Sequence, residues 1–176
     1  NPFLVSNIRG AFTVLDIITK QKKRMLQIST DEVFGSLSSN TATEESKLNP
    51  SSPYAATKAA AELLINSYCV TYDSDVIITR CTNNYGPRQF PEKLIPKTII
   101  LAKQGQNIPI YGNGENIRDW IHVDDHCNGI LSLLLDGKSG QSYNISANNE
   151  TDNVTIVKMI LEIMGKSEDL IEHVED

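Results

Sequence analysis

Short apolar segments alternate with segments of helical periodicity along the first half of this 176-residue chain. Residues 2–20 carry apolar side chains at helical spacing, and residues 53–72 follow a serine and begin with a proline, which is a typical helix start. Residues 25–29 and 75–80 are short runs rich in apolar and β-branched side chains, as in buried strands. This alternation predicts an α/β fold built on a parallel sheet.

The second half of the chain has shorter apolar runs, and its loops contain more proline, glycine and asparagine. We expect three helices in this half, near residues 93–104, 124–135 and 155–164. Thr155 is the expected cap of the third helix. Residues 108–114 are turn-rich, and residues 117–123 are an expected strand. We interpret the change after Thr82 as the passage from a sheet layer to a substrate-covering region.

Composition is that of an ordinary globular protein, with 40% apolar and 22% charged residues. The net charge of −6 argues against binding to nucleic acids or anionic membranes, because both favour basic patches. No apolar run approaches membrane-spanning length, and no signal peptide is visible. Cys69, Cys81 and Cys127 are far apart and lack metal-ligand spacing, so we expect reduced thiols and a cytoplasmic protein.

A hydroxyl and two carboxylates follow the first predicted strand directly. They belong to Thr30, Asp31 and Glu32. Parallel sheets bind ligands at the carboxyl ends of their strands, which is where this segment lies. Because adjacent side chains on an extended backbone point in different directions, Asp31 and Glu32 can address two substrate atoms, one as acid and one as base. The alternative is that they are surface loop charges or cap the following turn.

A tyrosine and a lysine lie at the start of the next predicted helix. Tyr54 and Lys58 are four residues apart and therefore share one helix face. An ammonium near a phenol lowers the pKa of the phenol, which would make Tyr54 a usable base. The alternative is a solvated helix face, since the spacing alone is common. The strand-end carboxylates one loop earlier favour the catalytic interpretation.

His122, Asp124, Asp125 and His126 lie close together in the sequence and could be taken for a metal site. A helix is expected to begin between the two histidines, so they do not share a face. A closed tetrahedral site needs about four ligands, and no thiol lies suitably near. We therefore expect no metal, with Asp124 acting as a helix cap.

Together these residues resemble the extended short-chain dehydrogenase/reductase family, and within it the nucleotide-sugar 4,6-dehydratases. The Asp31–Glu32 pair carries the distinction, because related epimerases and decarboxylases typically lack an aspartate at the position of Asp31. The resemblance covers nearly the whole chain, through Asn7 and residues 29–35, 54–58, 83–87, 91–96, 109–112 and 117–120. It implies a Rossmann-type parallel sheet with a smaller substrate-binding α/β region.

The resemblance also implies an NAD-dependent lyase that converts dTDP-glucose to a 4-keto-6-deoxy sugar nucleotide. Tyr54, assisted by Lys58 and Thr30, would take the proton of the 4-hydroxyl while a hydride leaves carbon 4 for NAD. Glu32 would remove the carbon-5 proton, which the 4-keto group acidifies. Asp31 would protonate the departing 6-hydroxyl, and the hydride would return to carbon 6, so that the cycle is redox-neutral.

By the same resemblance, cofactor contacts are expected from Asn7, Ser29, Tyr54, Lys58 and Asn84. Substrate contacts are expected from Thr30, Asn83, Lys93, Leu94, Pro109, Tyr111, Arg118 and Asn153. Lys93 and Arg118 can neutralise phosphate. Their alternative is surface ion pairing with Glu92 and Asp119. The alternative for Asn7 is a mid-helix polar side chain satisfied by backbone.

The resemblance divides the chain into two parts. Residues 1–82 would be the C-terminal part of an NAD-binding Rossmann domain, and residues 83–176 mainly the nucleotide-sugar region, with residues 117–136 returning to the first domain. The Gly-rich cofactor motif of the family is not in the chain, and neither is a late nucleotide-binding segment. We therefore expect a fragment that is inactive alone. Helices near 2–20 and 53–72 would form a homodimer interface.

Two departures from the family pattern are Phe34, where a tyrosine is common, and Thr82, where a serine is usual. Competing functions are a UDP-sugar dehydratase or decarboxylase of the same family, and a catalytically silent NAD-binding scaffold protein. Asp31 weighs against the decarboxylase. The presence of all five catalytic candidates (Thr30, Asp31, Glu32, Tyr54 and Lys58) weighs against the silent scaffold.

Overall fold

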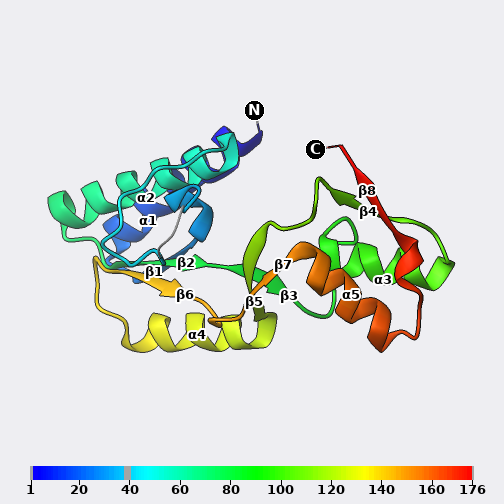
Figure 1. Cartoon of the computed structure of the whole chain (residues 1–176). Coiled ribbons are helices and arrows are strands. Elements are labelled where there is room, and N and C mark those ends of the chain that lie inside the picture. Colours follow the sequence, from blue (N-terminus) through cyan, green and yellow to red (C-terminus); the bar gives the residue numbers. More distant parts are fainter. Residues whose placement is uncertain (1, 38–40, 176) are drawn as a thin grey trace. The chain divides into compact units, whose positions relative to one another are not determined.

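The computed structural model describes residues 2–37 and 41–175, which form two compact units (Figure 1). The first unit comprises the described part of Asn1–Thr82 together with Asp125–Ile145. The second comprises Asn83–Asp124 and the described part of Ser146–Asp176. No helix within the described residues is long and apolar enough to cross a membrane.

The first unit is a three-stranded parallel sheet covered by helices on both faces (Figure 1). The strand order is β1-β2-β6, and α1 and α2 lie on one face while α4 lies on the other. The elements are η1 (Leu4–Gly10), α1 (Ala11–Gln21), β1 (Met25–Thr30), η2 (Asp31–Phe34), α2 (Pro53–Tyr72), β2 (Val76–Cys81), α4 (Val123–Asp136) and β6 (Ser142–Ile145). The predicted α/β fold with a parallel sheet is confirmed.

Helices and sheet of the first unit share an apolar core. Leu15 of α1, Ile65 of α2, and Val76 and Ile78 of β2 are all nearly fully buried in it. The Ser52 hydroxyl caps α2 by accepting the Ala55 N–H at 3.1 Å. This cap and the apolar face explain why the sequence begins a long helix at that position.

The second unit is built from small sheets and two helices that share a core. Its elements are β3 (Asn83–Tyr85), α3 (Leu94–Gln104), β4 (Ile108–Tyr111), β5 (Ile117–His122), β7 (Glu150–Asp152), α5 (Asn153–Ile163), η3 (Glu168–Leu170) and β8 (Ile171–Val174). β5 pairs in parallel with β3 and antiparallel with β7, and β4 pairs in parallel with β8. Ala102, Ile108, Ile110, Val157 and Leu161 form the core.

The structure corrects several local expectations. The helix expected over residues 2–20 is π-helical from Leu4 to Gly10 before α1 begins. The cap of α5 is Asp152, whose carboxylate accepts the Thr155 N–H at 2.7 Å. Asp124 is the second residue of α4 rather than its cap, and its own N–H donates to the His122 ring at 3.3 Å.

Long-range strand pairing accounts for the other differences. The turn-rich residues 108–114 contain β4, which finds its partner in β8. β5 stays in the second unit, so the segment that returns to the first unit is Asp125–Ile145 rather than 117–136. β6, β7 and β8 were not expected from the sequence, since each is only three or four residues long.

Candidate functional site

A tight turn at the carboxyl end of β1 presents the two candidate carboxylates. The Thr30 hydroxyl donates to Asp31 Oδ1 at 3.3 Å and accepts the Glu32 N–H at 3.3 Å. Val33 and Phe34 are buried beneath the turn. The Thr30 hydroxyl and the two buried side chains thus anchor this turn, while Asp31 is half-buried and Glu32 is exposed.

The environments of the two carboxyl groups differ. Burial, and secondarily the neighbouring Glu32 charge, raise the pKa of Asp31 above its ordinary value, against the opposing effect of the Thr30 hydrogen bond. Asp31 therefore holds its proton to higher pH than a solvated aspartate. An acid whose pKa is raised by burial, next to an exposed carboxylate, is suited to donating and removing protons in one reaction.

Tyr54 lies at the start of α2 within the same unit, with its ring edge-on to the Phe3 ring at 5.5 Å between centroids. Its pKa is raised, first by burial and then by the charges of Glu32, Cys81 and Asp31. The expectation that Lys58 lowers this pKa is therefore wrong for the chain as described. Tyr54 is protonated at neutral pH.

Lys58 makes a contact of its own on the sheet. Its ammonium donates to the Ile28 carbonyl oxygen on β1 at 2.9 Å. Burial lowers the pKa of Lys58, against the raising effects of Cys81 and Glu62. The ammonium has three hydrogens, and one has an acceptor among the described residues, so two remain for ligands.

Asn7 and Ser29 hold the framework of the site together. The Asn7 side-chain amide donates to the Thr57 hydroxyl at 2.9 Å, and that hydroxyl donates to the Tyr54 carbonyl oxygen at 2.8 Å. Asn7 is thus satisfied by a side chain of α2 rather than by backbone. Ser29 is 3% exposed and donates its hydroxyl to Glu62, so a cofactor contact of Ser29 is left to its backbone.

The expected substrate residues all lie in the second unit except Thr30. Asn83 is on β3, Lys93 and Leu94 are at the start of α3, Pro109 and Tyr111 are on β4, Arg118 is on β5, and Asn153 begins α5. Asn84, expected at the cofactor, is also on β3, and its carbonyl oxygen accepts from Gln89 at 2.8 Å.

The alternative of surface ion pairing fails for both basic residues. Neither Lys93 nor Arg118 forms an ion pair with another described residue. The Asp119 carboxylate instead accepts the backbone N–H groups of Ala147 and Asn149 at 2.9 and 2.6 Å. Among the residues at 2–37 and 41–175, Arg118 donates only to the Ile117 carbonyl oxygen, at 2.7 Å. Both cations therefore keep donors for an anionic ligand.

The histidines and aspartates near residue 124 were weighed as metal ligands, and they lie in the part of the chain that the structure describes. There, no group of three or more His, Cys, Asp or Glu side chains could hold a metal ion. His122 accepts the Asp124 N–H, and burial lowers the pKa of His126.

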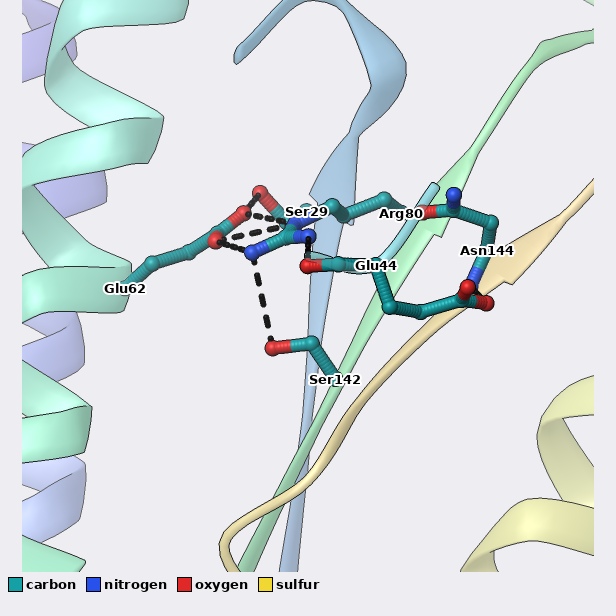
Figure 2. Close-up of polar contacts among 6 residues, drawn as sticks. All are labelled: Ser29, Glu44, Glu62, Arg80, Ser142 and Asn144. Atoms are coloured by element: carbon teal, nitrogen blue, oxygen red, sulfur yellow. Dashed lines mark hydrogen bonds and ion pairs between the residues drawn. The ribbon is translucent and has the colours of Figure 1, made fainter. Parts of the chain in front are cut away.

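A buried ion pair behind the site was missed from the sequence. Arg80 of β2 and Glu62 of α2 bind each other at 2.8 Å, with exposed side-chain fractions of 5% and 0% (Figure 2). Two signals were available: Glu62 lies four residues after Lys58, and Arg80 interrupts an otherwise uncharged buried strand.

The amino-acid sequence is similar to those of known proteins. The sequence matches the family described as GDP-mannose 4,6 dehydratase over residues 1–175. It is 48% identical to the low-salt glycan biosynthesis protein Agl12 of Haloferax volcanii and 45% identical to a dTDP-glucose 4,6-dehydratase of Streptomyces griseus. Each match covers 99% of this chain, with 57% and 53% of the relative. The chain therefore spans about half the length of the curated relatives it matches.

The fold is also similar to that of a solved structure. The dTDP-glucose 4,6-dehydratase of Bacillus anthracis, in complex with NAD, superposes with a TM-score of 0.97 at 46% identity. The match covers 99% of this chain and 57% of that one.

Proposed function

Because the chain belongs to the GDP-mannose 4,6-dehydratase family, we propose that the protein carrying it is an NAD-dependent dTDP-glucose 4,6-dehydratase. One observation carries the proposal. A half-buried acid with a raised pKa, Asp31, and an exposed carboxylate, Glu32, stand side by side at a strand end, in one unit with Tyr54 and Lys58. The names of the matched dTDP-glucose 4,6-dehydratases support this substrate.

The donors at the strand end fit the cofactor. Lys58 offers two free hydrogens at the carboxyl end of β1, where parallel sheets bind nucleotides. Asn84 is the further expected contact. When bound, NAD would accept a hydride from carbon 4, return it to carbon 6, and bring a positively charged ring to the site.

Each reactive group has a role in elimination of water. Tyr54 would take the proton of the 4-hydroxyl, with Thr30 and Lys58 beside it. Because the pKa of Tyr54 is raised in the chain alone, this role requires positive charge that arrives with ligands. Glu32 would remove the carbon-5 proton once carbon 4 is a ketone, and Asp31 would donate its proton to the departing 6-hydroxyl. Glu32 would give a proton back to carbon 5 as the hydride returns to carbon 6, so that the reaction balances.

The two units would divide the binding work. We assign most cofactor contacts to the first unit and most sugar-nucleotide contacts to the second, where Lys93 and Arg118 have unpaired cationic groups for a pyrophosphate. Asn83, Leu94, Pro109, Tyr111 and Asn153 would complete that site. Exposed apolar side chains on α1 and α2, such as Phe12 and Val70, support a homodimer through these helices. We further propose a cytoplasmic enzyme.

The experiment uses the full-length protein. It is incubated with NAD and, separately, with dTDP-glucose, UDP-glucose and GDP-mannose, and mass spectrometry follows the loss of one water. Water loss from dTDP-glucose is expected, and Glu32→Gln should reduce it by at least about 100-fold because it removes the base assigned to the carbon-5 proton. Water loss from UDP-glucose or GDP-mannose alone would contradict the proposed substrate. No loss from any of them would contradict the reaction.

A further inference from the structure

A buried ionic network joins β1, β2 and α2, next to the reactive groups of the first unit (Figure 2). Glu62 accepts the Ser29 hydroxyl and binds the Arg80 guanidinium through Nη2 at 2.8 Å and Nε at 3.1 Å. Arg80 also donates to the Glu44 carbonyl oxygen at 3.2 Å, and its guanidinium lies 5.0 Å from the centroid of the Phe34 ring. β1, β2, α2, η2 and the loop before α2 therefore meet at one charged centre.

The loop side of the network reaches the third strand of the sheet. The Glu44 carboxylate accepts the backbone N–H of Asn144 at 2.9 Å, and the Asn144 side-chain amide donates to the Ala42 carbonyl oxygen at 3.1 Å (Figure 2). β6 and the loop are thus held to each other as well as to Arg80.

Stabilisation of the fold does not by itself explain why the chain buries an Arg–Glu pair. Removing an Arg and a Glu from water has a large penalty, and apolar side chains of similar volume often make a fold equally or more stable. What the pair provides is direction, because the planar guanidinium holds its N–H donors in a rigid fork and so restricts how a carboxylate can accept from them. A buried pair of this kind therefore sets geometry.

The positions of Glu62 and Arg80 indicate which elements the pair orients. Tyr54, Lys58 and Glu62 follow one another at four-residue spacing and share one face of α2. Ser29, which Glu62 binds, immediately precedes Thr30, and Phe34, which Arg80 covers, ends the turn of Asp31 and Glu32. The network thus touches α2 one turn beyond Lys58, and it touches the carboxylate turn at both of its ends.

We propose that Glu62 and Arg80 are positioning residues that fix the register of α2 against the end of β1 and against the Asp31–Phe34 turn. In this way they set the spacing between the Tyr54–Lys58 face and the two carboxylates. The inference rests on the proposed dehydratase function, because it concerns the groups of that reaction. Neither residue contacts substrate in this role.

The test separates positioning from stability in the full-length protein. Glu62→Gln leaves Arg80 buried without its counter-charge, so both Tm and kcat fall, Tm by about 10 °C. The double variant Glu62→Leu with Arg80→Met removes both charges, so Tm recovers. Its kcat for water loss is expected to stay about 10- to 100-fold low, with KM for the sugar nucleotide within about threefold, because misplacement affects the chemical step.

A matched control lies at the opposite ends of the same two strands. Arg24 and Asp75 pair at 2.9 Å just before β1 and β2 begin. Their replacement by Met and Leu removes an Arg–carboxylate pair without touching the turn, so kcat should be unchanged. If the Glu62/Arg80 double variant regained wild-type kcat along with Tm, the pair would be a structural feature only, and the proposal would be overturned.

A second measurement keeps this test independent of the proposed reaction. If the wild-type protein released no water from any sugar nucleotide, the dehydratase assignment would fail on that result alone. Amide hydrogen exchange at residues 28–35 would then decide the positioning role. Faster exchange there in the double variant at recovered Tm supports it, and exchange equal to wild type overturns it.

Discussion

Gly35 makes the turn that presents Asp31 and Glu32 unusually sensitive to a single methyl group. Its backbone has φ 72° and ψ −160°, and a Cβ at this position would lie 2.1 Å from the Asn49 carbonyl oxygen. That approach is held by a hydrogen bond from the Asn49 N–H to the Val33 carbonyl oxygen at 2.9 Å. In Gly35→Ala the main chain of the loop must move, because the obstacle is backbone.

Two contributions set the loss of stability expected for Gly35→Ala, namely backbone strain and a lost hydrogen bond. An L residue in this region of φ and ψ costs about 1–3 kcal/mol. Loss of the Asn49–Val33 hydrogen bond adds about 1 kcal/mol. We therefore expect Gly35→Ala to lower the free energy of unfolding by about 3 kcal/mol. The displaced turn carries both carboxylates, so kcat should fall at least about tenfold as well.

Gly140 provides the matched control in the same unit. It also has a positive φ of 75°, but the nearest atom to an added Cβ is Cys69 Cβ at 4.0 Å. Gly140→Ala should therefore cost only about 1 kcal/mol of strain and leave kcat unchanged. Urea unfolding and steady-state kinetics of the full-length variants measure both effects. Losses of stability equal within about 0.5 kcal/mol would refute the steric reasoning.

Two further predictions concern the same unit. In the folded protein Asp31 binds its proton at higher pH than in the unfolded chain, so stability falls as pH rises through its raised pKa. Asp31→Asn should accordingly raise Tm at pH 7 and abolish water loss. The gain in Tm should shrink toward pH 4, where the wild-type carboxyl group is increasingly protonated. A gain in Tm that does not depend on pH would contradict this prediction. Ser52→Ala should lower the free energy of unfolding by about 1 kcal/mol, because it removes the cap of α2, whereas Ser51→Ala at the exposed neighbouring position should not. Equal urea midpoints for the two serine variants would refute the role of the cap.

Local periodicity was sufficient to predict most of the first unit, although not the short strand β6. The strands near residues 25–29 and 75–80 and the helix near 53–72 are confirmed, because each has a continuous apolar pattern and the helix has a strong start signal. Their alternation led to the parallel sheet, which is also confirmed. The second unit was harder to predict, since β4 becomes a strand only by pairing with β8, some sixty residues later in the chain. No local pattern encodes such a pairing.

The candidate site shows the same division. Its residue types and spacing were visible in the sequence, because a strand end and a helix face are local features. Their electrostatics were not, since the pKa of Tyr54 depends on burial and on carboxylates more than twenty residues away. Likewise, the sequence contains Ser29, Glu62 and Arg80 but does not show that they bind one another. Periodicity along the chain determines which elements form, whereas contacts between elements decide charge, burial and orientation at the site, because these depend on neighbours that only the folded chain brings together.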